Sequence, residues 1–141
     1  MENSFVIGVD IGGTNTVYGF IDHLGKIIEY NQISTNASLP ADDLINRLEV
    51  NFKKFIKLNP NYVLKGIGIG APNGNHLTGI IVNPPNLNWG DIDIQSRLKN
   101  IFSCKVILTN DANAAALGEK KYGVAKNMND FIMITLGTGL G

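Results

Sequence analysis

A glycine-rich turn near the start of the chain has the residue types that bind phosphate. The apolar run 5–9 is followed by Asp10, by the turn Gly12-Gly13-Thr14 and by a second extended segment, 16–21. Glycines permit a tight turn whose backbone N–H groups can approach an anion closely. Neither GxxxxGK[ST] nor GxGxxG occurs, so a hairpin rather than a P-loop would hold the phosphate. In an isolated hairpin, Asp10 could simply accept hydrogen bonds from its own turn.

A second glycine turn at the other end of the chain favours the phosphate interpretation. Gly137, Thr138 and Gly139 follow the apolar run 131–136, which we expect to be a buried strand. Clamping a polyphosphate from both sides requires two such turns. The pair of turns therefore predicts a nucleotide or polyphosphate site.

Asn110 and Asp111 form another pair of residues that could do chemistry. They follow the apolar run 105–108 and precede an alanine-rich segment that extends to about residue 122. Asn and Asp are preferred helix N-caps, so a structural role is one interpretation of Asp111. The other is a general base that accepts a hydroxyl proton while that oxygen attacks phosphorus, with Asn110 orienting the same substrate.

Hydrophobic periodicity predicts the elements that would position these groups. Three extended segments joined by short turns predict an antiparallel meander, and the next segment carries its apolar residues on one helical stripe. The order β-β-β-α-β-α-β-α indicates an α/β fold with a mixed sheet. The expected strands are 5–9, 16–21, 25–33, 63–70, 79–82, 105–108 and 131–136, and the expected helices are 41–58, 94–102 and 111–122.

The candidate residues all follow predicted strands. Asp10, the loop 71–74, the pair at 110–111 and the turn 137–139 each come directly after an extended segment. Ligands of α/β sheets gather at the carboxyl ends of strands, so we expect these groups to converge on one site. Trp89, in the Pro- and Asn-rich loop 83–90, would either wall a sugar ring or cover the edge of the core.

Composition indicates a globular protein without a charge bias. The 141 residues are 44% hydrophobic and 17% charged, and twelve basic residues balance twelve acidic ones. This argues against a nucleic-acid partner, which needs a basic surface. The single Cys104 can form no internal disulfide and has no CxxC spacing for zinc. With no leader-like or membrane-length apolar segment, we expect a cytoplasmic protein.

Taken together, the motifs resemble the ROK family of sugar kinases and sugar-responsive repressors. The resemblance covers essentially the whole chain and rests on five short motifs in the right order. They are the Asp10 turn, the loop Gly70-Ala71-Pro72, Asn86-Leu87 with Trp89, the segment 110–115, and the turn 137–141. The family implies an actin-like ATPase, ribonuclease H-like fold in which two α/β domains close over sugar and ATP.

The resemblance also implies a role for each motif. Asp10 would help to hold Mg²⁺ through ATP, and Asp111 would be the base for the sugar hydroxyl. The phosphates would contact Gly12, Gly13, Thr14, Gly137, Thr138 and Gly139. The sugar would contact Asn110, Asp111, Gly74 and Asn86.

The resemblance places further parts of the family's site after Gly141. We therefore expect residues 1–125 to form the first α/β domain and residues 126–141 to begin a second. The family's structural zinc site and adenosine pocket would lie in the remainder, with no zinc in this chain, and a homodimer is an expectation for the complete protein. This chain would then be the amino-terminal part, inactive alone.

Three functions compete at this point. The leading one is a glucokinase-type sugar kinase that transfers the γ-phosphoryl group of ATP to a hexose hydroxyl. The second is a ROK-type sugar-responsive transcriptional regulator, which would need a helix-turn-helix before the first strand, where this sequence has four residues. The third is an actin-like structural ATPase, which shares the phosphate turns but gives no reason for Asn110-Asp111.

Overall fold

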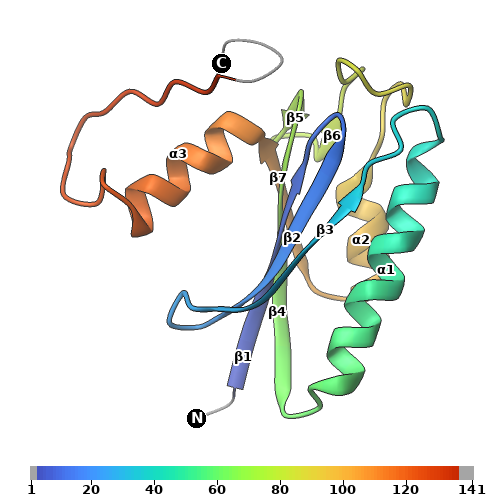
Figure 1. Cartoon of the computed structure of the whole chain (residues 1–141), viewed down its shortest axis with the longest axis horizontal. Coiled ribbons are helices and arrows are strands. Elements are labelled where there is room, and N and C mark those ends of the chain that lie inside the picture. The colour runs from blue at the N-terminus through green and yellow to red at the C-terminus, as the bar shows by residue number, and fades with distance from the viewer. Residues whose placement is uncertain (1–2, 137–141) are drawn as a thin grey trace.

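A five-stranded mixed sheet is the centre of the molecule (Figure 1). The computed structural model describes residues 3–136. The spatial order of the strands is β3-β2-β1-β4-β7; β1 pairs antiparallel with β2 and parallel with β4, and β4 pairs parallel with β7. The strands are β1 (Asn3–Ile11), β2 (Asn15–Asp22), β3 (Ile27–Ser34), β4 (Tyr62–Ala71) and β7 (Lys105–Asn110).

The two faces of the sheet differ because the side chains alternate in size and polarity. Ile7, Val9, Ile67, Ile69 and Leu108 point to one face and are buried. Helices α1 (Ala41–Leu58) and α2 (Ile94–Phe102) cover this face, as Figure 1 shows. The opposite face carries glycines and a few larger side chains. Helix α3 (Asp111–Tyr122) packs against this opposite face, at β4 and β7. Bulk packing is therefore concentrated on one face, which leaves the other for the site.

Aromatic rings fill the space between α1 and the sheet. The rings of Phe20 and Phe55 stack with centroids 3.6 Å apart. Phe52 is fully buried and meets the rings of Tyr18 and Phe20 edge-on, at 5.3 and 6.0 Å. Such ring pairs add about 0.5–1.5 kcal/mol each beyond the area that they bury. This cluster fixes α1 on the meander.

Local sequence explains where the helices begin. Pro40 directly precedes α1, and its ring fixes its own backbone φ at −57°, a value compatible with the start of a helix. Asp42 and Asp43 lie in the first turn, where the helix dipole favours negative charge. Asp93 caps α2 by accepting a hydrogen bond from the Ser96 N–H at 3.0 Å. Both helices have the bounds that the sequence predicts.

The structure differs from the sequence prediction in three places. Residues 131–135 belong to no strand of the described chain, and Ile132 and Leu136 are exposed, so the strand predicted at 131–136 is wrong. An apolar run needs a ladder partner to become a strand, and the described sheet ends at β7 beside α3. A short strand, β5 (Gly74–Asn75), was not expected; it pairs with β6 (Ile80–Ile81), which is shorter than the predicted 79–82.

We expect Phe52→Ala to destabilise the fold strongly, because it removes a ring that several others contact. The loss in free energy of unfolding should be about 3–5 kcal/mol. Val50→Ala, on the exposed side of the same helix, is the control and should change stability by less than about 0.5 kcal/mol. Urea denaturation of both variants checks this. Equal losses would show that the aromatic cluster does not anchor α1.

Candidate active site

The β1–β2 connection is a tight hairpin turn, as the sequence predicts. The Gly12 N–H donates to the carbonyl oxygen of Asn15 at 3.0 Å. A Cβ on Gly12 would lie 2.8 Å from that same oxygen, so no other residue fits this position without moving the turn. Gly13 lies beside Asn86, whose Cβ would be 3.5 Å from a Cβ at position 13. The turn thus has an exposed tip next to the loop that carries Asn86.

Strand register brings Asp10, the carboxylate predicted to help hold Mg²⁺ through ATP, into line with two other strand ends. Asp10 is opposite Gly70 on β4, and Gly70 is opposite Thr109 on β7. Because β1, β4 and β7 are parallel, their carboxyl ends meet at one edge of the sheet. Asp10, Gly70 and Thr109 also share the face of the sheet away from α1. The predicted convergence of these strand ends is confirmed.

Gly70 separates the two carboxylates of the site. A Cβ built on Gly70 would lie 3.9 Å from Asp10 Oδ1, 3.4 Å from the Cα of Asp111 and 3.0 Å from the Cβ of Ala114. Helix α3 can approach β4 this closely because position 70 has no side chain and position 114 has only a methyl group. The close approach places Asp111 across Gly70 from Asp10.

Asn110, rather than Asp111, is the N-cap of α3. Its Oδ1 accepts hydrogen bonds from the N–H groups of Ala112 and Asn113, at 2.9 and 3.4 Å. Asp111 is the first residue inside the helix and is exposed, with Oδ1 2.9 Å from the Ala112 nitrogen. The interpretation of Asp111 as the cap is therefore wrong. Oδ1 of Asn110 serves the helix, which leaves its amide N–H₂ as the group that could meet a substrate.

The surroundings of Asp10 disfavour its charge. Partial burial of the carboxyl group raises its pKa above the usual value of 3.8, and the negative charge of Asp111 raises the pKa further. Oxygen ligands of this kind suit Mg²⁺, which is commonly bound through one or two carboxylates together with substrate phosphates and water. Among the described residues no cluster of three or more His, Cys, Asp or Glu side chains forms. The donor set fits a cation that a phosphate helps to hold.

A cleft of about 350 Å³ lies between the two carboxylates. It is lined by Val9, Asp10, Gly70, Asp111, Ala112, Ala114, Ala115 and Thr135. Thr135 was not a candidate in the sequence because it lies inside an apolar run. The residue lines the cleft because residues 131–135 lie outside the sheet.

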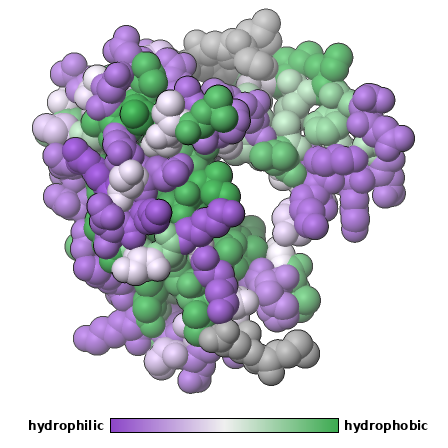
Figure 2. All heavy atoms as spheres, turned by 180° about the vertical axis from the view of Figure 1, so that it is seen from behind, coloured by the Kyte–Doolittle hydropathy of each residue, from purple (hydrophilic) through white to green (hydrophobic). Residues whose placement is uncertain are grey.

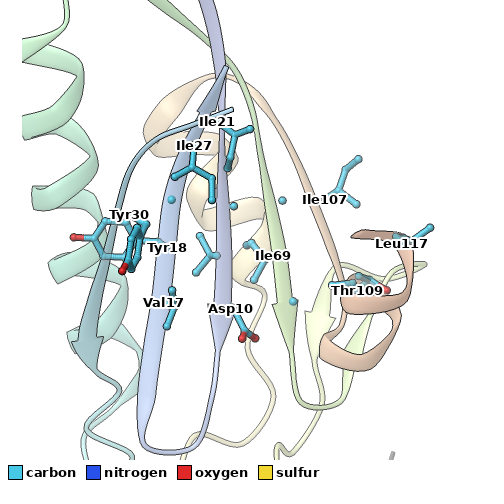
Figure 3. A pocket seen from close by; sticks show the side chains of 16 residues that line it. Asp10, Val17, Tyr18, Ile21, Ile27, Tyr30, Ile69, Ile107, Thr109 and Leu117 are labelled. Carbon is cyan, nitrogen blue, oxygen red and sulfur yellow. The ribbon is translucent and has the colours of Figure 1, made fainter. Parts of the chain in front are cut away.

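An apolar groove of about 590 Å³ continues from the site along the open face of the sheet. Figure 3 shows Asp10 and Thr109 near one end and Ile21 and Ile27 near the other. In Figure 2 apolar side chains border a hollow beside the sheet. The apolar wall explains the desolvation that raises the pKa of Asp10.

The remaining predicted residues are placed around the same edge of the sheet. Gly74 packs on the end of β7, where an added Cβ would lie 2.5 Å from the carbonyl oxygen of Thr109. Asn86 is exposed beside the turn, with φ of 64°. Trp89 is half-buried against the core and donates from Nε1 to the Leu39 carbonyl at 3.1 Å, so it covers the core edge. Gly137, Thr138 and Gly139 lie outside the described residues.

The described chain has a mixed α/β sheet with one glycine-rich hairpin turn and two carboxylates that line one cleft, and comparison with known proteins gives the family. The ROK family model matches residues 6–141, and the chain belongs to that family. ROK sugar kinases have the actin-like ATPase fold, and this is the fold of the chain. The resemblance seen in the motifs is confirmed.

Curated relatives include both kinases and repressors. The chain is 33% identical to the glucokinase of Halalkalibacterium halodurans over its whole length and 35% identical to the xylose repressor of Bacillus spizizenii over 97% of its length. It covers 44% of the former and 36% of the latter. The chain thus spans less than half the length of these relatives.

Solved structures of sugar kinases superpose on the chain. A ROK family glucokinase from Streptomyces griseus, in complex with glucose and AMPPNP, matches 97% of the chain with a TM-score of 0.79 and 30% identity. An inorganic polyphosphate/ATP-glucomannokinase from an Arthrobacter strain matches 99% with a TM-score of 0.79 and 29% identity. The chain covers 43% and 57% of these structures.

We expect Gly70→Ala to destabilise the chain, because the new methyl group would meet the Cβ of Ala114 at 3.0 Å and push α3 away from β4. Such overpacking costs about 1–3 kcal/mol. Gly68→Ala is the matched control on the same face of the same strand, where an added Cβ meets nothing within 4 Å. It should be neutral or slightly stabilising. If both variants unfold at the same urea concentration, α3 does not depend on Gly70.

Proposed function

We propose that the protein is a hexose kinase that transfers the γ-phosphoryl group of ATP to a sugar hydroxyl. The apposition of Asp10 and Asp111 across Gly70, at the edge of the sheet, is the observation that supports this most directly. A phosphoryl transferase needs a group that handles phosphate charge and a group that accepts the hydroxyl proton, within reach of each other. The kinases among the relatives support the same reaction.

In this proposal Asp111 is the general base. Its carboxylate is exposed at the start of α3 and faces the cleft that it shares with Asp10. It would accept the proton of the sugar hydroxyl as that oxygen attacks the γ-phosphorus. The amide N–H₂ of Asn110, together with the loops of Gly74 and Asn86, would orient the sugar.

Asp10 and the glycine turns would handle the phosphates. Asp10 would help to hold Mg²⁺ together with the phosphates of ATP, and the bound ion would supply positive charge against the charge that develops during the transfer. The turn at 12–14 would direct backbone N–H groups to the phosphate oxygens. The turn at 137–139 is proposed as the opposing half of the clamp. A cytoplasmic location and a homodimer remain proposals for the whole protein.

A ROK-type transcriptional regulator is the second candidate, because the xylose repressors match the chain as well as the glucokinases do. A regulator that binds sugar without turnover does not need a base. Steady-state assays of the full-length protein with hexoses, xylose and ATP separate the two: sugar-dependent ADP formation supports the kinase. Sugar binding with no ADP formation, together with sugar-dependent DNA binding, would establish the regulator.

We expect Asp111→Asn to lower kcat by roughly 10²–10⁴-fold, because an amide cannot accept the proton. The hexose KM should change little, since the base acts mainly in the transition state. Stability should be nearly unaffected because Asn110 is the cap, whereas Asn110→Ala should cost about 1 kcal/mol. Hexose-dependent ADP formation and thermal unfolding measure both. A near wild-type rate in Asp111→Asn would refute the base assignment.

We expect Asp10→Asn to weaken Mg²⁺-dependent turnover while raising stability at neutral pH. A folded-state pKa above 3.8 means that the native protein binds the Asp10 proton more tightly than the unfolded chain does, so the ionised carboxylate destabilises the fold above that pH. The stability advantage of the variant should therefore vanish as the pH falls below about 3.8. Thermal unfolding without Mg²⁺ at several pH values measures the stability difference between Asp10→Asn and wild type. Asp130→Asn, at an exposed carboxylate, is the control. A variant less stable than wild type at pH 7 would support a structural turn role instead.

A further inference from the structure

Two buried threonines connect the phosphate turn to the end of β3. Thr16 and Thr35 are 0% and 1% exposed. Thr35 Oγ1 donates to the carbonyl oxygen of Gly12 at 2.7 Å. Since a hydroxyl has one proton to donate, the 2.9 Å hydrogen bond between the two hydroxyls runs from Thr16 Oγ1 to Thr35 Oγ1. A directed chain of hydrogen bonds therefore ends on the backbone of the turn.

Thr35 also holds the turn through its own backbone. Its N–H donates to the carbonyl oxygen of Thr14 at 2.8 Å. Arg47 of α1 fixes the segment from the other side by donating to the carbonyl oxygens of Ser34 at 2.7 Å and Thr35 at 3.4 Å. Asp43 pairs with Arg47 at 2.8 Å and keeps the guanidinium in place. Thr35 thus has a fixed position from which it contacts two peptide groups of the turn.

The two contacts determine where the turn's N–H groups point. In a trans peptide the C=O and N–H of one unit point in opposite directions, and the described chain has no cis peptide bond. The Gly12 carbonyl is held toward buried Thr35, so the Gly13 N–H of the same unit points away from it. The Thr14 carbonyl is held on the β3 side by the Thr35 N–H, so the Asn15 N–H points to the β1 side, where Asn15 lies opposite Gly12 across the hairpin. The N–H of Gly12 is already bonded to Asn15.

We propose that Thr35 is the positioning residue of the phosphate turn: it holds the Gly12 carbonyl and so aims the Gly13 N–H outward as a phosphate donor, while Gly12 shapes the turn. The assignment rests on the proposed function, because the ligand of the turn is the polyphosphate of the donor substrate. It also revises the expected phosphate contacts, since the Gly12 N–H is already bonded to the Asn15 carbonyl and is not a phosphate donor. A threonine far along the chain from the motif would then set nucleotide affinity.

The kinetic test is Thr35→Val in the full-length protein. Valine keeps the shape but removes the hydroxyl, so the Gly12–Gly13 peptide is no longer held. Weakening one hydrogen bond to a charged phosphate corresponds to a rise of about tenfold in the KM for ATP. The hexose KM should stay within about twofold, and Thr35→Ser, which keeps the donor, should restore the KM for ATP.

The matched control is Ser34→Ala, which removes a neighbouring hydroxyl that bonds to exposed Asn36. It should leave both KM values unchanged. An unchanged KM for ATP in Thr35→Val would overturn the proposal. So would equal rises in both KM values without rescue by serine, because that pattern indicates a general structural defect.

A second measurement needs neither a variant nor turnover. In ¹⁵N-labelled wild-type protein titrated with magnesium pyrophosphate, the amide signal of Gly13 should shift and that of Gly12 should move much less. A shift at Gly12 as large as at Gly13, or no shift at Gly13, would overturn the proposal even if Thr35→Val fails to fold. If the Gly13 amide shifts as expected but no hexose is phosphorylated, the positioning role stands and the kinase proposal fails.

Discussion

The parallel pairing of β1, β4 and β7 is the constraint on which the rest of the site depends. Parallel strands end at the same edge of a sheet, so Asp10, Gly70 and Thr109 lie side by side even though about a hundred residues separate the first from the last. Parallel strands need crossover connections, and α1 and α2 provide them on the face that the aromatic cluster fills. The core of the molecule thus supports the site from the opposite face of the sheet.

The site itself is not arranged for stability. Two carboxylates face one cleft, and the apolar groove beside Asp10 raises the pKa of that residue. Groups whose charge is disfavoured in this way are common at functional sites, where a ligand completes the charge balance. Packing on the α1 face offsets the destabilisation that the charge of Asp10 causes, because the rings of Phe20, Phe52 and Phe55 stabilise the sheet independently of the site.

Small residues and buried hydroxyls provide the precision that the charges require. Gly70 and Ala114 set the distance between β4 and α3, and Gly12 sets the shape of the β1–β2 turn. Thr16 and Thr35 then fix the orientation of the turn's peptide groups from inside. Backbone geometry at the proposed phosphate site is therefore determined by residues that would not touch the ligand.

The sequence by itself determined the elements and the class of the fold, because hydrophobic periodicity and helix-start signals are local. The helices at Ala41–Leu58 and Ile94–Phe102, the meander and the order of strands were all predictable, as was the convergence of Asp10 with Asn110 and Asp111. The conformation of residues 131–136 could not be predicted from the sequence, because an apolar run becomes a strand only where the edge of another strand is available to pair with it. Tertiary structure also decided that Asn110 is the cap, that Thr35 holds the turn and that Gly70 separates the carboxylates. These facts depend on contacts between residues distant in sequence or on the orientation of one side chain, neither of which leaves a local pattern.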